Sequence, residues 1–154
     1  EIDLELEGER TELWIHAAER MTVRGNIGSG EAQAIHLIHS DRDEVEGTGL
    51  VSIEVPLDTG GMDYRDLVRA LAAVVAAPKP VAVHCWRGSD RTGAVCAAWR
   101  VAVEGWTPQA ALDEMVAGGF GHSAYYGNLR ELIGHLDGER LRADLAAAVA
   151  GASR

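Results

Sequence analysis

The first third of the chain carries strand-like patterns of apolar and polar positions. Residues 2–7 (IDLELE) alternate apolar and acidic side chains, as expected for a strand with one buried face. Residues 34–39 and 50–55 are short apolar runs separated by an acidic, glycine-containing turn at 41–49, so we expect two strands of one sheet. The pattern of residues 12–23 fits a strand or a helix, and both alternatives stay open.

Helical spacing of the apolar residues dominates after residue 60. Residues 62–77 repeat apolar positions at helical intervals until Pro78, and residues 81–84 (VAVH) are typical of a short buried strand. Further helices, separated by glycines, are predicted at residues 92–104, 108–116, 125–136 and 139–150. This order predicts one α/β domain over residues 1–154, with a central four- or five-stranded mixed sheet and helices on both sides. The glycine-rich run at 25–30 is interpreted as a loop rather than a dinucleotide site.

The composition narrows the range of partners. The chain has 24 acidic and 14 basic residues and a formal charge of −10, which does not fit nucleic-acid binding. No apolar run is long enough to cross a bilayer, so we expect no integral membrane association and, by default, a cytoplasmic location. Because the sequence starts at Glu1 rather than Met, that expectation does not cover a removed targeting segment. Arginine, alanine and glycine are abundant beside the single lysine, Lys79, which indicates a bacterial source.

The segment 84–93 (HCWRGSDRTG) lies between a predicted buried strand and a predicted helix. A loop in this position directs backbone N–H groups inward, and the helix dipole adds partial positive charge, so we expect it to bind an anion. The same field lowers the pKa of a thiol, which would make Cys85 a nucleophile at neutral pH. Arg91 is placed to hold two phosphoryl oxygens in a bidentate fork and to stabilise the transition state.

The other residues of this segment are expected to support that chemistry. Gly88 permits the backbone turn, and Thr92 can donate its hydroxyl to the thiolate as it leaves a phosphocysteine intermediate. His84 orders the loop by hydrogen bonding or is simply a packed residue. The predicted phosphate-binding loop comprises Trp86, Arg87, Gly88, Ser89, Asp90 and Arg91.

This segment resembles the active-site signature of the protein tyrosine and dual-specificity phosphatases: Cys, five residues, Arg, then Ser or Thr. Downstream segments resemble the helical tail of small bacterial dual-specificity-like phosphatases, so the likeness covers residues 34–136 and leaves 1–30 unmatched. The resemblance implies that Cys85 forms a thiophosphate ester, while an aspartic acid protonates the leaving oxygen and then activates water. Neither a metal nor another cofactor is expected.

The resemblance places the general acid on a loop upstream of the cysteine, after a strand that ends in proline. Asp58, in the string VPLD, fits this position and is the first candidate. Asp63 is the second candidate, although it fits better as the N-cap of a helix that starts at Tyr64. Asp58 has an alternative interpretation as a turn former.

The substrate class stays open. The side chains of Trp86, Arg87 and Asp90 are expected to fan out around the pocket mouth, and Arg87 and Asp90 resemble the loops of inositol-phosphate and phosphoinositide phosphatases. If Arg87 instead pairs with a carboxylate and Trp86 packs on the core, phosphotyrosine or phosphoserine proteins are equal candidates. Cys96 is interpreted as a small core residue, with a protective disulfide to Cys85 as the alternative. His122 either reaches the site or is an exposed loop histidine.

Other functions share part of this pattern. A rhodanese-like sulfurtransferase or an arsenate reductase also places a cysteine on an anion-binding loop, but the Arg91 and Thr92 pair disfavours both. A catalytically inactive phosphate-binding module is the alternative outside enzymes. An RNA 5′-phosphatase is disfavoured by the acidic composition. The sequence does not indicate an oligomeric state.

Overall fold

The computed structural model describes residues 2–6, 9–15, 33–36, 51–77 and 81–152. Its strands form a five-stranded sheet in the order β1-β2-β5-β3-β4, in which β1 and β2 are antiparallel and the other pairs are parallel. The α/β class is therefore confirmed. The strands are β1 (Ile2–Leu6), β2 (Glu9–Ile15), β3 (Gln33–His36), β4 (Val51–Glu54) and β5 (Val81–His84).

The strand predictions can be compared with these elements. The alternating segment at residues 2–7 is confirmed as β1, and β2 shows that residues 12–15 of the ambiguous segment are strand. The two apolar runs become β3 and β4, which are neighbours in one sheet and run parallel. The glycine-rich run at 25–30 and the turn at 41–49 lie outside the described residues.

The central position of β5 fixes where the following loop begins. Ile15 of β2 is level with Val83 on one side, and His36 of β3 is level with His84 on the other. Because both neighbours run parallel to β5, their carboxyl ends meet at the same edge of the sheet. Loops that follow parallel strands at this edge are common ligand sites in α/β folds.

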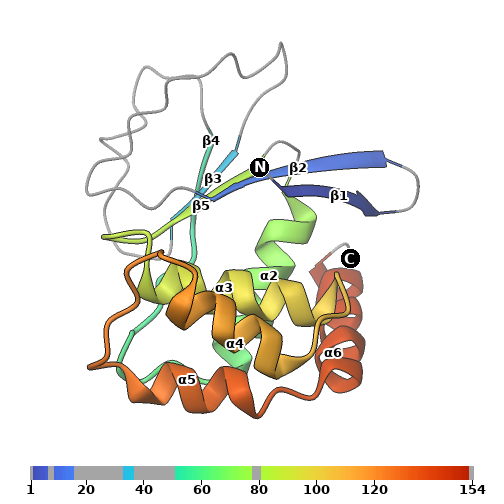
Figure 1. Ribbon diagram of the computed structural model, residues 1–154. Coiled ribbons are helices and arrows are strands. Elements are labelled where there is room, and N and C mark those ends of the chain that lie inside the picture. Colours follow the sequence, from blue (N-terminus) through green and yellow to red (C-terminus); the bar gives the residue numbers. More distant parts are fainter. Residues whose placement is uncertain (1, 7–8, 16–32, 37–50, 78–80, 153–154) are drawn as a thin grey trace.

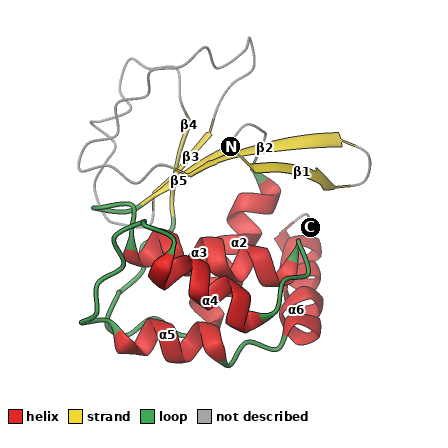
Figure 2. Cartoon of the chain, in the orientation of Figure 1, coloured by secondary structure: helices red, strands yellow, loops and turns green. Residues whose placement is uncertain are grey.

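Five described helices lie on one face of the sheet (Figures 1 and 2). The predicted helices on both sides are thus found on one side among the described residues, and the prediction for the other side stays untested. Each predicted helical segment overlaps one of them, with ends that differ by up to two residues. The helices are α2 (Tyr64–Ala76), α3 (Asp90–Ala102), α4 (Pro108–Ala117), α5 (Gly127–Gly134) and α6 (Gly138–Ala152).

Helix α3 lies inside the helical layer and packs against its neighbours. Trp99 is 2% exposed, and Ala94 and Ala98 are fully buried. A Cβ atom added at Gly93 would lie 3.2 Å from Cγ of Met115, so α4 passes close to the first turn of α3. Arg100 adds a two-atom ion pair to Glu114, with both N–O distances at 2.9 Å. These contacts hold both ends of α3, whose first turn carries the predicted arginine, against α4.

The core extends from α3 to the flanking helices. Its fully buried leucine and isoleucine side chains come from α2, α5 and α6, and each contributes about 1.5–3 kcal/mol on burial. They are Leu67, Leu71, Leu129, Ile133 and Leu141. Among the described residues, the helices are all too short or too polar to cross a membrane.

Candidate functional site

The segment after β5 forms a tight loop that ends in helix α3. Gly88 has a φ of 67°, in the left-handed region that favours glycine, so the predicted need for glycine here has a backbone cause. Ser89 precedes α3 at the N-cap position, but its side chain makes no capping hydrogen bond. The first N–H groups of α3 are thus left uncapped by this serine and face the end of β5, where a helix dipole favours an anion.

Cys85 lies at the base of this loop and is 6% exposed. Burial alone would raise the pKa of its thiol. The Thr92 hydroxyl, the backbone N–H groups of Thr92 and Arg87, and the charge of Arg91 outweigh burial, so the pKa of Cys85 lies below its ordinary value. Thr92 is fully buried, and its Oγ1 makes no regular hydrogen bond to another described residue, so the hydroxyl is available to the thiolate. The structure thus brings Cys85, Arg91 and Thr92 together around a stabilised thiolate.

The loop that carries Asp58 is linked to the cysteine loop through its backbone. Arg91 donates from Nη1 to the carbonyl oxygen of Leu57 at 3.4 Å, next to Asp58. Asn128 of α5 donates from Nδ2 to the carbonyl oxygen of Thr59 at 2.8 Å. Asp58 itself is exposed, and its Oδ1 accepts a hydrogen bond from the N–H of Gly60 at 3.1 Å. The predicted acid therefore sits on a loop that both Arg91 and α5 hold from the backbone side.

Asp63 is engaged elsewhere. Its Oδ1 accepts hydrogen bonds from the N–H groups of Arg65 at 2.8 Å and Asp66 at 3.1 Å. The Asp66 carboxylate in turn accepts from the N–H of Asp63 at 3.2 Å, which completes a capping box. The prediction that Asp63 caps a helix beginning at Tyr64 is confirmed.

The remaining predicted residues divide into exposed and buried groups. Trp86 is 73% exposed and Arg87 is also exposed, whereas His84 is 5% exposed. The alternative in which Trp86 packs on the core is therefore wrong. Cys96 and Cys85 are both free cysteines, and burial raises the pKa of Cys96 to about 12. No disulfide protects Cys85 in this structure.

Asp90 and His122 are placed differently from the prediction. Instead of fanning out at the pocket mouth, Asp90 directs Oδ1 at the loop between α4 and α5, where it accepts a hydrogen bond from the N–H of Ser123 at 2.8 Å. The same oxygen lies 3.0 Å from Nδ1 of His122, whose side chain is fully buried. The interpretation of His122 as an exposed loop histidine is therefore wrong.

Sequence reasoning missed the residues that hold the two loops. Asn128, the Leu57 carbonyl and Ser123 all contact the site from distant parts of the chain, 69, 34 and 33 positions from their partners. A polar residue at the start of a predicted helix was the only local signal for Asn128. The other two contacts use backbone groups, which the identity of a residue does not reveal.

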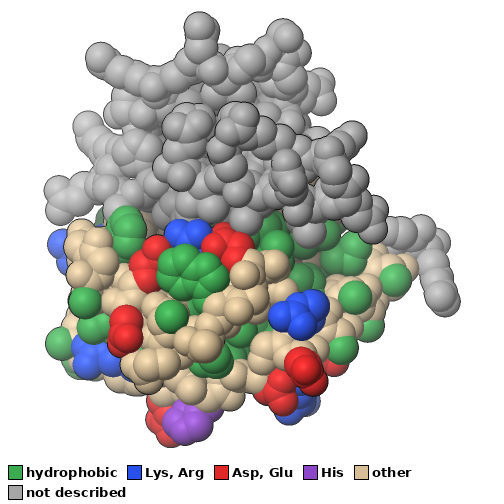
Figure 3. Space-filling view, turned by 45° about the vertical axis from the view of Figure 1, so that its right-hand side comes forward, with side chains coloured by type: hydrophobic (Ala, Val, Ile, Leu, Met, Phe, Trp, Pro, Cys, Tyr) green, Lys and Arg blue, Asp and Glu red, His purple; other side chains and the backbone are tan. Residues whose placement is uncertain are grey.

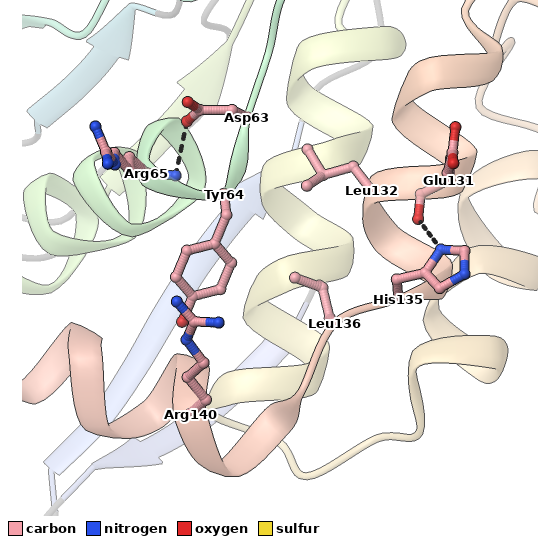
Figure 4. Close-up of a pocket in the computed structure, with 8 residues that line it drawn as sticks. All are labelled: Asp63, Tyr64, Arg65, Glu131, Leu132, His135, Leu136 and Arg140. Atoms are coloured by element: carbon pink, nitrogen blue, oxygen red, sulfur yellow. Dashed lines mark hydrogen bonds between the residues drawn. The ribbon is translucent and has the colours of Figure 1, made fainter.

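A separate pocket of about 700 Å³ lies between α2, α5 and α6 (Figure 4). Figure 4 shows Arg140 stacked against the ring of Tyr64, with the guanidinium carbon 4.8 Å from the ring centroid. Asp63 is the one predicted residue that lines this pocket, and it is already used as a helix cap. The residues predicted to carry out catalysis, Cys85, Arg91 and Asp58, do not line this pocket.

On the described part of the face drawn in Figure 3, charges of both signs are interspersed and the basic side chains are few and separated. Such a distribution does not form the continuous basic stripe of a nucleic-acid interface. Among the described residues, no group of three or more His, Cys, Asp or Glu side chains is arranged to hold a metal ion.

A comparison with known families matches most of the chain. Residues 2–125 match the model of a family described as "DSP-PTPase phosphatase fused to NAD+ Kinase". The chain belongs to this phosphatase family. The match includes β1 and β2, in the first thirty residues that the sequence resemblance did not cover, and it contains the whole cysteine loop. The resemblance to dual-specificity phosphatases is therefore confirmed.

Individual relatives agree with the family. The dual specificity protein phosphatase TpbA of Pseudomonas aeruginosa is 39% identical over 71 residues, which is 45% of this chain and 33% of TpbA. The chain thus matches about a third of the length of this curated relative. A crystal structure of TpbA has a TM-score of 0.68 and 30% identity, covering 74% of this chain and 73% of the other.

Two further structures extend the comparison. A TpbA variant with a Cys-to-Ser substitution, in complex with phosphotyrosine, has a TM-score of 0.69 and 28% identity over 75% of this chain and 74% of the other. The core catalytic domain of the PP-IP phosphatase Siw14 from Saccharomyces cerevisiae has a TM-score of 0.60 and 20% identity over 75% and 73%. The second likeness shows a shared fold.

Proposed function

We propose that this chain hydrolyses phosphomonoesters through a phosphocysteine intermediate on Cys85. The observation that carries the proposal is the thiol of Cys85, buried at the carboxyl end of the central strand and stabilised as a thiolate by Thr92 and Arg91. A thiolate at a helix N-terminus beside an arginine is both a nucleophile and part of an anion site. Membership of the phosphatase family supports this assignment.

In the first step, Sγ of Cys85 attacks phosphorus and the bond from phosphorus to the leaving oxygen breaks. Asp58 gives its proton to that oxygen, while the Arg91 guanidinium and the N–H groups of the loop hold the other phosphoryl oxygens. In the second step, the Asp58 carboxylate takes a proton from water as the water oxygen attacks phosphorus. The S–P bond breaks, Thr92 donates a hydrogen bond to the departing thiolate, and inorganic phosphate is released.

Phosphotyrosine in a protein is the substrate class that the site favours. Trp86 directly follows the nucleophile and is 73% exposed, so an aromatic surface is available beside the phosphate loop. TpbA, 28% identical in its phosphotyrosine complex, supports the same class. A phosphorylated inositol or a phosphoinositide headgroup is the second candidate, favoured by the additional positive charge of exposed Arg87.

The test is hydrolysis of a small aryl phosphate by the wild type and by Cys85→Ser and Asp58→Asn variants. Cys85→Ser should abolish turnover, and Asp58→Asn should lower kcat by about 10²- to 10⁴-fold because general acid catalysis is lost. Asp113→Asn is the matched control for the acid, since Asp113 lies on α4 and contacts Gln109 instead of the site. A panel of phosphotyrosine and phosphoserine peptides, inositol phosphates and phosphoinositides then ranks the substrate classes by kcat/KM.

Two results of the same assay would contradict the proposal. If the wild type binds inorganic phosphate but turns over no member of the panel, the chain is a phosphate-binding module and not an enzyme. If the Cys85→Ser variant retains wild-type turnover, the phosphocysteine mechanism is wrong.

A further inference from the structure

The loop between α4 and α5, residues 118–126, packs against the cysteine loop. Its Ser123 N–H donates to Oδ1 of Asp90 at 2.8 Å. A Cβ atom added at Gly121 would lie 3.9 Å from Cβ of Ser89, an ordinary van der Waals contact. Asp90 begins α3 and directly precedes Arg91. A contact that fixes the Asp90 carboxylate therefore also restrains the neighbouring residue, Arg91, which is predicted to bind phosphate.

His122 bridges Asp90 and a cation on helix α5. Its Nδ1 lies 3.0 Å from Oδ1 of Asp90, and its Nε2 accepts a hydrogen bond from Nε of Arg130 at 3.4 Å. Because the arginine can only donate, Nε2 must be unprotonated, and a neutral ring then carries its proton on Nδ1. Nδ1 is buried and is the ring nitrogen nearest the carboxylate, although the contact lacks the angle of a regular hydrogen bond. Burial and the charge of Arg130 lower the pKa of His122 despite the opposing effect of Asp90, which agrees with a neutral ring.

This arrangement holds a negative charge beside an anion site. A free carboxylate at the start of α3 would repel a bound phosphate and oppose ionisation of Cys85. In the structure, one Asp90 oxygen is instead turned towards the Ser123 N–H and the His122 ring, and its side chain is 13% exposed. The contacts from Ser123 and His122 therefore keep the Asp90 carboxylate from rotating towards the predicted phosphate-binding loop.

We propose that His122 is a positioning residue of the phosphate loop, which orients Asp90 and thereby the first turn of α3 that carries Arg91. The inference rests on the proposed function, since it concerns the same loop. His122 touches neither the reacting thiol nor the phosphate in this role. It acts through Asp90, in the way that second partners orient the groups that bind a ligand directly.

The experiment compares His122→Ala and His122→Asn with His135→Ala, a histidine control at the exposed C-cap of α5. The readouts are the dissociation constant of inorganic phosphate, the pH dependence of Cys85 alkylation, the melting temperature, and kcat and KM for an aryl phosphate. We expect His122→Ala to weaken phosphate binding and to lower kcat/KM by about ten- to a hundredfold, the cost of a small misplacement of a binding group.

Two further results separate positioning from a purely structural role. His122→Asn keeps an N–H donor near the position of Nδ1 and should restore part of the phosphate affinity. Asp90→Asn combined with His122→Ala removes the repelling charge, so the double variant should bind phosphate more tightly than His122→Ala alone. Cys85 of His122→Ala should also be alkylated at higher pH than in the wild type, because the released carboxylate opposes the thiolate.

The proposal is overturned if His122→Ala lowers the melting temperature but leaves phosphate affinity and Cys85 alkylation as in the wild type. Phosphate affinity and alkylation do not require turnover. Failure of the proposed function, seen as no turnover in the wild type, is therefore distinguishable from failure of this inference.

Discussion

Removing the Thr92 hydroxyl tests the origin of the reactive thiolate. Thr92→Val keeps the shape of a fully buried side chain and deletes the one group that donates a side-chain hydrogen bond to Cys85. Hydrogen bonds to charged groups contribute about 1.5–3 kcal/mol, and 1.36 kcal/mol changes an ionisation constant about tenfold. The pKa of Cys85 should therefore rise, and its thiolate fraction at acidic pH should fall about ten- to a hundredfold.

The assay is the rate of Cys85 alkylation by iodoacetamide as a function of pH. Cys96 is half-buried, and burial raises the pKa of its thiol to about 12, so its alkylation should lie at higher pH than that of Cys85. Thr107→Val is the matched control: it removes the cap of α4, which accepts from the N–H of Ala110 at 3.2 Å, and should cost stability without moving the alkylation profile. Superimposable profiles for Thr92→Val and the wild type would refute the reasoning.

Thr92→Val should also change how the free energy of unfolding depends on pH. The pKa of Cys85 in the folded protein lies below its ordinary value, so the ionised thiol stabilises the fold above that ordinary value. This contribution is lost as the pH falls through the folded-state pKa. Thr92→Val reduces it, so urea denaturation should show a larger destabilisation of the variant at alkaline pH than at acidic pH.

Three further substitutions test the helix cap, the core and the loop. Asp63→Ala should lower the free energy of unfolding by about 1 kcal/mol through loss of the α2 cap; loss of aryl phosphate turnover in the folded variant would instead make Asp63 the general acid in place of Asp58. Leu71→Ala, at a fully buried position, should cost about 2–5 kcal/mol in urea denaturation, and a cost below 1 kcal/mol would contradict the described core. Gly88→Ala forces a side chain into left-handed backbone at φ 67°, at a cost of about 1–2 kcal/mol, and should weaken inorganic phosphate binding measured by calorimetry; Gly127→Ala, which has open space around its Cβ, should not.

Local signals were enough to predict the elements that position the site. Asp63 followed three residues later by Asp66 gives the carboxylates of the capping box, and Pro78 follows closely on the end of α2. The run VAVH is buried at three of its four positions, as its composition suggests. Each of these features depends on residues that are close in the sequence, so a pattern of a few positions is sufficient to indicate it.

The contacts that complete the site could not be predicted in this way. Asp90 was expected to face the substrate, because the segment 84–93 alone does not show that Ser123 and His122 lie beside it. Those contacts join positions 33 and 32 residues apart and depend on how α4 and α5 return to the start of α3. The parallel pairing of β3 and β4 has the same cause, since pairing direction depends on the route of the connection and not on the strands themselves.

The central place of β5 in the sheet also determines which strands separate from it first when the protein partly unfolds. Among the described strands, β5 is bonded on both sides, by β2 and β3, whereas β4 is bonded to β3 alone and leads directly into the loop that carries Asp58. Edge elements open with a smaller free energy than central ones, so amide exchange should reach β4 before β5. A fluctuation of this kind would displace Asp58, the proposed proton donor, while the cysteine loop stays assembled. The partly opened molecule would retain phosphate and trap the thiophosphate ester, with its hydrolysis delayed until the edge closes again.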